Sequence, residues 1–324
     1  MPSFRFIAPR KFFITALCGL ATGVLMACSE PQSSVNTADI RETTASDRSQ
    51  LKGEPVRFGV LSIDSAVSVN ERYRPLLDYL EAELERPFEL ISLTQESQFT
   101  EVEAGNLDFT TNNPLAAVQI RRLHDTEFLV THSRPKTGPQ FSGLIVVRAD
   151  SEIKTLEHLR GKRVSCVNFQ TAAAGCVFQI YHLQQNGIDP ARDFADFTEN
   201  KSQDSIVLAV INGTIDAGFI RTGQLEKMVG KELIPNVNVL RVLAPVDDNF
   251  LYTHTTALYP EWPIAALPQT DSELAEQVRE ALLNIPPDHP SLKPAKVEGF
   301  IPTVSYDDLD SLVETLKLKS WDSK

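Results

Sequence analysis

An acid and an arginine in the segment KSQDSIVLAVINGTIDAGFIRT (residues 201–222) could together bind a charged small molecule. Asp204 follows Ser202 at the start of a predicted helix, and Arg221 is followed by Thr222 at the end of a predicted strand. The N–H groups at a helix start attract anions, and a guanidinium can bind an oxyanion through two parallel hydrogen bonds. These residues predict a site for a small, at least partly anionic ligand.

The elements that position these residues are predicted from the apolar pattern. Apolar residues at helical spacing follow Asp204, and Gly213 ends the helix because glycine adopts the left-handed conformation without steric cost. Ile215–Ile220 is a short apolar strand, whose carboxyl end would face a ligand crevice in an open α/β sheet. A structural alternative stays open, in which Asp204 caps its helix and Arg221 pairs with a surface carboxylate.

The first 27 residues have the order of a secretory signal peptide. Three basic residues precede the apolar run FFITALCGLATGVLMA, which is shorter than the ~20 residues that span a bilayer. Residues 25–28 (LMAC) resemble the bacterial lipobox, and this resemblance implies that Cys28 is lipidated and becomes the mature N-terminus. The alternatives are an ordinary signal peptide that is cleaved nearby and an uncleaved anchor.

Residues 28–53 contain few large apolar side chains, so we expect a lipid anchor followed by a flexible tether. The protein would then be a membrane-anchored lipoprotein of the periplasm or the cell surface. The chain of 324 residues carries a net charge of −12, which argues against binding to the phosphates of nucleic acids.

The remaining chain alternates strands and helices in two similar halves, which predicts two α/β lobes with parallel strands in each sheet. The halves share a phrase, AGNLDF and NGTIDA, whose Asp108 and Asp216 we interpret as turn residues at strand entry rather than as ligands. The predicted boundaries are residues 54–141 plus 248–324 for the first lobe and residues 142–247 for the second.

Two helices of the first lobe are predicted in detail. One spans Arg72–Leu84, with Pro75 tolerated in its first turn, so that Tyr73 follows a loop that could border the ligand cleft. The other spans Ser305–Leu316, with Ser305 and Asp308 placed as a capping box.

Several phrases of the chain resemble the periplasmic phosphonate-binding proteins of ABC importers, over roughly residues 55–268. They are RYRPLLDYLEAEL, LEHLRGKRVSCVN, NGIDPARDF and SQDSIVLAVINGTIDAGF. The resemblance implies a type II periplasmic binding protein fold, in which two α/β lobes close on a ligand about a hinge. Two further phrases, DAGFIRTGQLEKM and YPEWPIAALPQT, resemble the sensor domains of tetrathionate-sensing histidine kinases, which use this fold as a receptor.

The resemblance also nominates site residues. Phosphonate binders hold the ligand on a Ser/Thr-rich stretch before a glycine, which here reads QTAAAG, so that Thr171 matches and alanines follow it. The family places an acid at the position of Asp204, where it can meet a ligand amine, and the loop after the third strand, with Asn112 and Asn113, lines the cleft. Arg221 matches the kinase-sensor pattern.

Cys166 and Cys176 remain as a pair once Cys18 leaves with the signal peptide and Cys28 is lipidated. An even pair in an oxidising compartment favours a disulfide, which would contribute roughly 3 kcal/mol. Two unpaired buried thiols, or a redox or sulfur-ligand role beside the predicted anion loop, are the alternatives. The six histidines are scattered, so the sequence predicts neither a metal site nor a cofactor.

We therefore predict a lipid-anchored solute-binding protein that presents a phosphonate, phosphate or phosphite-like oxyanion to an ABC permease. The alternative is a receptor of the same fold that signals a sulfur oxyanion, such as tetrathionate or thiosulfate, to a sensor kinase. No Ser/His/Asp order or phosphate-loop pattern supports an enzyme, and we expect a monomer.

Overall fold

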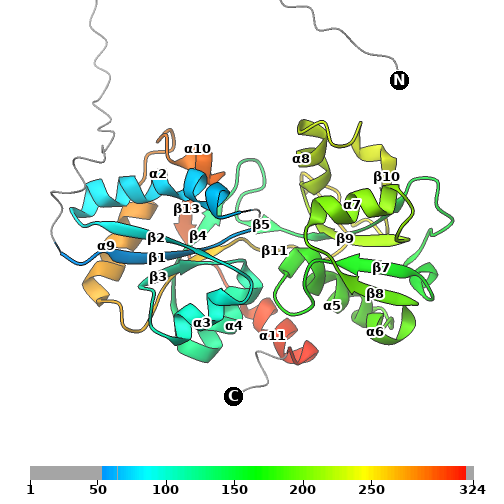
Figure 1. The fold of residues 1–324 in the computed structure, drawn as a ribbon, viewed down its shortest axis with the longest axis horizontal. Helices are drawn as coiled ribbons and strands as arrows, with labels where there is room; N and C mark the ends of the chain where they lie inside the picture. Colours follow the sequence, from blue (N-terminus) through cyan, green and yellow to red (C-terminus); the bar gives the residue numbers. More distant parts are fainter. Residues whose placement is uncertain (1–52, 64, 319–324) are drawn as a thin grey trace, which may run out of the picture. The chain divides into compact units, whose positions relative to one another are not determined.

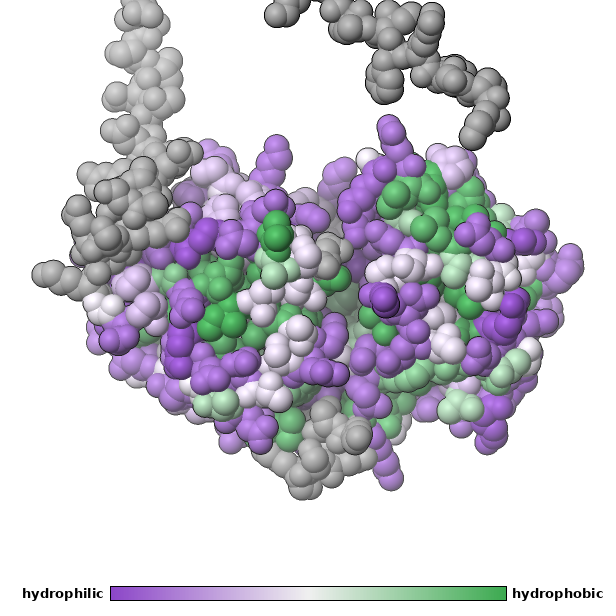
Figure 2. All heavy atoms as spheres, viewed as in Figure 1, coloured by the Kyte–Doolittle hydropathy of each residue, from purple (hydrophilic) through white to green (hydrophobic). Residues whose placement is uncertain are grey.

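The computed structural model describes residues 53–63 and 65–318. The predictions for the signal peptide, for lipidation of Cys28 and for residues 28–52 of the tether lie outside the described residues. All described residues belong to one compact unit, which contains two mixed β-sheets with helices packed against them (Figure 1). Hydrophilic side chains cover most of the face shown in Figure 2.

The first sheet has six strands in the order β13-β4-β12-β3-β1-β2. Its β1, β2 and β3 run parallel, whereas β12 and β13, which come late in the chain, join it in antiparallel pairs. The C-terminal part of the chain therefore returns to the first sheet. The strands are β1 (Val56–Leu61), β2 (Phe88–Leu93), β3 (Phe109–Thr111), β4 (Glu127–Ser133), β12 (Pro263–Ala266) and β13 (Gly299–Pro302).

The second sheet repeats this plan with five strands in the order β10-β6-β9-β7-β8. Its β7, β8 and β9 run parallel, and β6 and β10 join in antiparallel pairs. Where the chain passes between the sheets, β5 (Gln140–Phe141) pairs with β11 (Tyr259–Pro260). The strands of the second sheet are β6 (Gly143–Arg148), β7 (Arg163–Cys166), β8 (Asp196–Glu199), β9 (Ala217–Arg221) and β10 (Leu240–Val242).

An equivalent arginine–aspartate ion pair lies at the start of the parallel strands in each sheet. Arg57 of β1 donates from its backbone and its guanidinium to Asp108, with Nη2 to Oδ1 at 2.7 Å. Arg163 of β7 donates to Asp216 in the same way, with Nη2 to Oδ1 at 2.8 Å. The shared aspartates are thus structural residues at strand entry, each held by an arginine of the neighbouring strand.

The helix α2 (Ala66–Leu84) begins earlier than predicted, because the side chain of Ser65 caps it by accepting a hydrogen bond from the N–H of Ser68. Pro75 therefore lies inside the helix rather than in its first turn, and Tyr73 lies on its buried face rather than after a loop.

The last helix, α11 (Asp307–Leu316), also starts differently. Ser305 Oγ accepts a hydrogen bond from the N–H of Asp307, and Tyr306 is the N-cap, so the predicted capping box is wrong. The remaining helices are α3 (Ser97–Glu103), α4 (Pro114–His124), α5 (Phe178–Gln185), α6 (Pro190–Asp193), α7 (Gln203–Ile211), α8 (Gln224–Gly230), α9 (Ser272–Leu283) and α10 (Leu292–Ala295). In residues 53–63 and 65–318, none of the helices has the length and apolar character needed to span a membrane.

One hydrophobic cluster joins α4 and α11 to elements of the second sheet. It contains Leu115 of α4, Phe178 of α5 and Leu309 of α11, all with no exposed surface. Burial of such side chains contributes roughly 1.5–3 kcal/mol each, so α4 and α11 are fixed against the elements of the second sheet.

Candidate functional site

Arg221 is the last residue of β9, which spans Ala217–Arg221, whereas the sequence predicts a strand over Ile215–Ile220 with Arg221 just past its end. Its backbone N–H donates to Gln203 Oε1 at 2.8 Å, and its Nε donates to the carbonyl of Thr222 at 3.2 Å. Within the part of the chain that the structure describes, its guanidinium forms no ion pair with a carboxylate. Burial lowers the pKa of this guanidinium, so the cation is held in a poorly solvated place.

The charges of two further arginines lower the pKa of Arg221. Arg72 lies in α2 and Arg134 follows β4, and both lower the pKa of Arg221, whereas Glu261 raises it. We call Arg72, Arg134 and Arg221 the arginine cluster. With Glu261 it combines three positive charges with one negative charge.

Arg134 is held firmly within this cluster. Its Nε lies 3.2 Å from Glu261 Oε2, and its Nη1 donates to the carbonyls of Ala295 and Lys296, both at 3.2 Å. Burial lowers the pKa of Arg134, but the charge of Glu261 and the nearby Tyr73 more than offset this and raise it. Arg134 is therefore a fixed cation whose own charge Glu261 balances.

Arg72 brings an unsatisfied polar atom to the same place. Its guanidinium carbon lies 5.4 Å from the centroid of the Tyr73 ring, and its buried Nε lacks a hydrogen-bond partner. The buried hydroxyl of Tyr73 is engaged by a hydrogen bond with Arg134. Because nearly all buried polar groups in proteins are paired, an unpaired N–H donor beside an excess of positive charge points to a bound anion.

His132 packs beside these residues as a neutral ring. Its Nδ1 lies 2.6 Å from the carbonyl of Trp262, which can only accept, so the proton is on Nδ1. Burial lowers the pKa of His132 well below its usual value, and Arg134 lowers it further. The ring, with no exposed surface, lies edge-on to Tyr73, with 6.5 Å between the ring centroids.

The other predicted residues near Arg221 are engaged by the protein. Ser202 caps α7 by accepting from the N–H of Ser205 at 3.1 Å. The carboxylate of Asp204 accepts from the Gln224 amide and lies 3.6 Å from Lys227 Nζ.

The hydroxyl of Thr222 accepts from the N–H of Ser142 at 3.2 Å and is buried. This bond links the turn after β9 to the start of β6. Ser202, Asp204 and Thr222 thus fix the segments around Arg221 and, in this conformation, do not turn free polar atoms to the cluster.

Asn112 and Asn113 are buried and bonded. The amide of Asn112 donates to Gln98 Oε1 at 2.7 Å, within the first sheet and its helices. Asn113 caps α4 by accepting from Ala116 N–H at 3.2 Å, and its amide donates to the carbonyl of Thr171 at 2.9 Å. Asn113 thereby connects α4 to the loop after β7.

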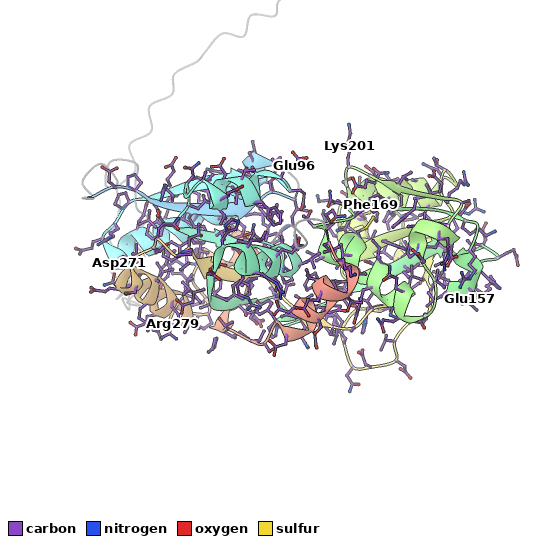
Figure 3. The ribbon with its side chains drawn as sticks, turned by 90° about the horizontal axis from the view of Figure 1, so that it is seen from below. Glu96, Glu157, Phe169, Lys201, Asp271 and Arg279 are labelled. Carbon is purple, nitrogen blue, oxygen red and sulfur yellow. A yellow bond between two sulfur atoms is a disulfide. The ribbon has the colours of Figure 1, made fainter. Side chains whose placement is uncertain are left out.

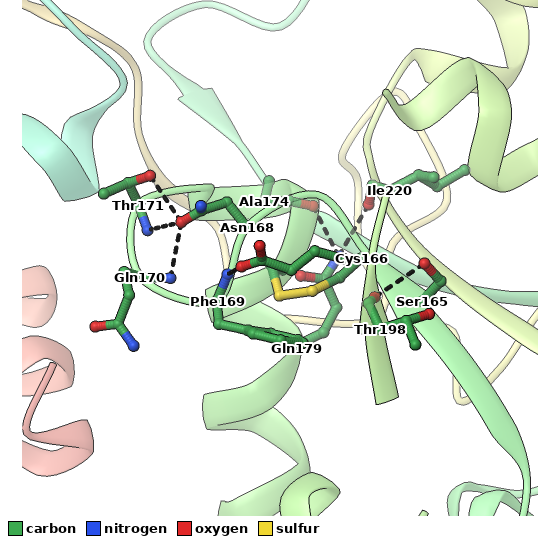
Figure 4. Close-up of a disulfide and its surroundings, with 12 residues drawn as sticks. Ser165, Cys166, Asn168, Phe169, Gln170, Thr171, Ala174, Gln179, Thr198 and Ile220 are labelled. Atoms are coloured by element: carbon green, nitrogen blue, oxygen red, sulfur yellow. Dashed lines mark hydrogen bonds between the residues drawn. A yellow bond between two sulfur atoms is a disulfide. The ribbon is translucent and has the colours of Figure 1, made fainter. Parts of the chain in front are cut away.

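Thr171 belongs to this loop, which residues 168–171 form. Its Oγ1 lies 2.6 Å from Gln95 Oε1, beside the first sheet, and 2.9 Å from Asn168 Oδ1 (Figure 4). Gln119 of α4 adds a hydrogen bond to the carbonyl of Gln170 at 3.1 Å. The loop therefore makes direct contact with the first sheet's helices and connections.

A disulfide joins Cys166, at the end of β7, to Cys176 in a π-helical turn (Ala173–Val177), with 5.0 Å between the Cα atoms (Figure 4). Both residues have no exposed surface. The disulfide brackets the loop of residues 168–171, and its enclosed sulfur atoms are not offered to a ligand.

A family model described as "ABC transporter, phosphonate, periplasmic substrate-binding protein" matches residues 58–309. The chain belongs to this family. Its members are binding proteins rather than enzymes, and its location is the periplasm. The mixed α/β architecture is that of the periplasmic binding proteins, as the sequence predicts.

Individual relatives agree with this assignment. The chain is 28% identical over 234 residues to the tetrathionate sensor histidine kinase TtrS of Salmonella typhimurium, which covers 71% of this chain and 39% of the kinase. It spans about two fifths of the length of that relative.

Two solved structures share the fold. PhnD1 from Prochlorococcus marinus in complex with methylphosphonate has a TM-score of 0.66 and 16% identity, covering 81% of this chain and 98% of PhnD1. XAC2383 from Xanthomonas citri bound to ATP has a TM-score of 0.69 and 21% identity, covering 82% of this chain and 98% of XAC2383.

The sequence reasoning names Arg221 as a site residue and Tyr73 as a residue that could border the cleft, and it gives no role to Arg72 and Arg134. The predicted helix starts at Arg72, so Tyr73 is expected after a loop, whereas it lies on the buried face of α2. For Arg134, which follows β4, the sequence offers no comparable signal. In the described residues, no group of three or more His, Cys, Asp or Glu side chains could hold a metal ion.

Proposed function

We propose that this chain is a lipid-anchored periplasmic binding protein that holds a small oxyanion on the arginine cluster, between its two lobes, and delivers it to an ABC importer. The observation that carries the proposal is Arg221, a buried guanidinium without a carboxylate partner among the described residues, beside two more arginines. A phosphonate, phosphate or phosphite-like anion would compensate this charge.

A second candidate is a receptor that reports a sulfur oxyanion, such as tetrathionate or thiosulfate, to a separate sensor kinase. The identity to the tetrathionate sensor kinase favours it. Both candidates use the same site, and they differ in the partner, a permease or a kinase.

Thermal unfolding of the full chain in detergent, with a panel of oxyanions, tests the proposed function. A ligand at a hundred times its dissociation constant adds about 2.7 kcal/mol to the free energy of unfolding. We expect stabilisation by at least one small oxyanion and its loss in Arg221→Ala. The matched control is Arg279→Ala, since Arg279 lies on α9 and pairs with Glu276 of the same helix (Figure 3). No stabilisation by any member of the panel would contradict the proposal.

The anchor and the partner need separate tests. Cys28→Ala should release the protein from the membrane fraction, and unchanged fractionation would refute lipidation as the anchor.

Deletion of the gene should abolish uptake of the radiolabelled ligand if the protein serves an importer. Loss of a ligand-dependent transcriptional response with normal uptake would instead support the receptor.

A further inference from the structure

We propose that Tyr252 borders the oxyanion site beside Arg221, and that Asp248 and His254 position it there. This inference rests on the proposed function, because it adds residues to the same site. Tyr252 touches the bound anion through its hydroxyl, whereas Asp248 and His254 act only through Tyr252.

Arg221 and Tyr252 meet at one turn of the backbone. The Nε of Arg221 donates to the carbonyl of Thr222 at 3.2 Å. On the next residue, a Cβ at Gly223 would lie 3.4 Å from Cε2 and 3.6 Å from Cζ of Tyr252, so the phenol ring lies against this turn. Gly223 has a φ of +75°, which glycine adopts without steric cost. The guanidinium and the phenol therefore contact neighbouring residues directly after β9.

The phenol of Tyr252 has bonding capacity to spare. The residue is half-buried, and within residues 53–63 and 65–318 its hydroxyl makes no hydrogen bond. A phenol hydroxyl can donate a hydrogen bond to an anion. Burial lowers the pKa of Arg221, and the charge that Tyr252 can carry acts on this pKa in the opposite direction, which agrees with a phenol close to the guanidinium. The two side chains can thus present N–H and O–H donors to one oxyanion.

The segment that carries Tyr252 needs specific contacts to hold this side chain in place. Residues 243–258 connect β10 to β11 and contain neither helix nor strand. Residues 244–249 of this segment are all exposed. A segment with so little buried surface is held in one conformation mainly by its own hydrogen bonds and ring contacts.

Asp248 and His254 supply these contacts. His254 is buried, with Nδ1 at 2.8 Å from the carbonyl of Thr256 and Nε2 at 3.0 Å from Asp248 Oδ2. The other carboxylate oxygen, Asp248 Oδ1, accepts from the N–H of Phe250 at 2.9 Å. The Phe250 ring lies edge-on to both His254 and Tyr252, with 5.5 and 6.4 Å between the ring centroids. Asp248 therefore fixes the backbone and the ring that pack beside Tyr252.

The histidine and the turn after β9 are anchored at the same place. Thr256, which bonds the histidine, accepts at Oγ1 from the N–H of Gly143 at 2.9 Å and donates from its N–H to the carbonyl of Gly143 at 3.1 Å. The neighbouring Ser142 donates from its N–H to Thr222 Oγ1 at 3.2 Å. The start of β6 thus fixes the tyrosine and the arginine relative to each other.

Isothermal titration calorimetry on the full chain in detergent tests the role of Tyr252. The probes are methylphosphonate, phosphate, phosphite, thiosulfate and tetrathionate, and the variants are compared with the probe that binds the parent most tightly. Tyr252→Phe should weaken its binding at least fivefold, because a hydrogen bond to a charged group is lost. Thermal unfolding without oxyanion shows that each variant is folded.

A double-mutant cycle tests the positioning role of Asp248. Asp248→Ala should weaken binding at least fivefold in the parent but less than twofold when it is added to Tyr252→Ala. The matched control is Asp247→Ala, which should change binding less than twofold, because Asp247 is exposed and makes no hydrogen bond or ion pair within the described residues. Equal weakening by Asp248→Ala with and without the phenol would overturn the positioning role, since a merely structural effect does not depend on Tyr252.

The outcomes separate this inference from the proposed function. An oxyanion whose binding is lost in Arg221→Gln, but which binds folded Tyr252→Phe and Tyr252→Ala as tightly as the parent, would overturn the inference and keep the proposed function. Binding of none of the probes by the folded parent would overturn both.

Discussion

Replacing Gln179 by leucine should destabilise the second sheet, because this one side chain bonds to three backbone carbonyls. Its Nε2 donates to Leu144 at 3.1 Å, to Ala174 at 2.7 Å and to Ile220 at 2.9 Å, and the residue has no exposed surface (Figure 4). Leucine fills a similar volume but donates nothing. The two N–H protons of Nε2 are shared among the three carbonyls, so with about 1 kcal/mol for each lost bond we expect the free energy of unfolding to fall by about 2 kcal/mol.

Urea unfolding followed by circular dichroism measures this loss. The matched control is Gln184→Leu on the same helix, where the side chain is exposed and the change should stay within about 0.5 kcal/mol. Because Ile220 precedes Arg221, Gln179→Leu should also weaken oxyanion binding. A loss below about 1 kcal/mol, or one equal to that of the control, would refute the role given to Gln179.

Three further predictions concern stability. The double substitution of Cys166 and Cys176 by alanine should cost roughly 3 kcal/mol in urea unfolding, since the disulfide closes a short loop, and a reductant should destabilise the parent but not the variant. Arg163 donates a hydrogen bond to Asp216 and lowers the pKa of its carboxyl. The stabilisation of the folded protein by this pair is therefore fully present above the usual carboxyl pKa and is lost as the pH falls through the lowered pKa. Asp216→Asn should therefore lower the free energy of unfolding at pH 7 by about 1 kcal/mol, and this difference should vanish as the pH falls below the lowered pKa of Asp216. A pH-independent difference would contradict this. Gly218→Ala should lower the free energy of unfolding by about 1–3 kcal/mol, because the new Cβ would lie 2.4 Å from Ile206 of α7. An unchanged midpoint of thermal unfolding would contradict this and show that α7 shifts to make room for the methyl group.

Much of the fold follows from local signals in the sequence. The strand β9 is found at Ala217–Arg221, close to the predicted Ile215–Ile220, and α7 begins after Ser202, whose side chain caps it. The repeated phrase around Asp108 and Asp216 correctly indicates two sheets of one plan. These features depend on neighbouring residues, so a single sequence displays them.

The site depends on contacts between distant parts of the chain, and the sequence reveals less of it. Arg221 stands out because it ends a strand, but the charge excess arises only when Arg72, Arg134 and Glu261 come together. The engagement of Asp204 by Gln224 is likewise a tertiary contact. A carboxylate at a helix start that the sequence shows as available for a ligand can thus already accept a hydrogen bond from a side chain of the next helix.

A crystal structure of the chain grown with selenate tests the central claim most directly. Selenate is a divalent anion that, like sulfate, carries no proton at neutral pH, and its selenium is located by anomalous scattering. We predict a selenium peak whose oxygens lie within hydrogen-bonding distance of the guanidinium groups of Arg72 and Arg221. A peak on the loop of residues 168–175, or no peak near the arginine cluster at saturating selenate, would contradict the account.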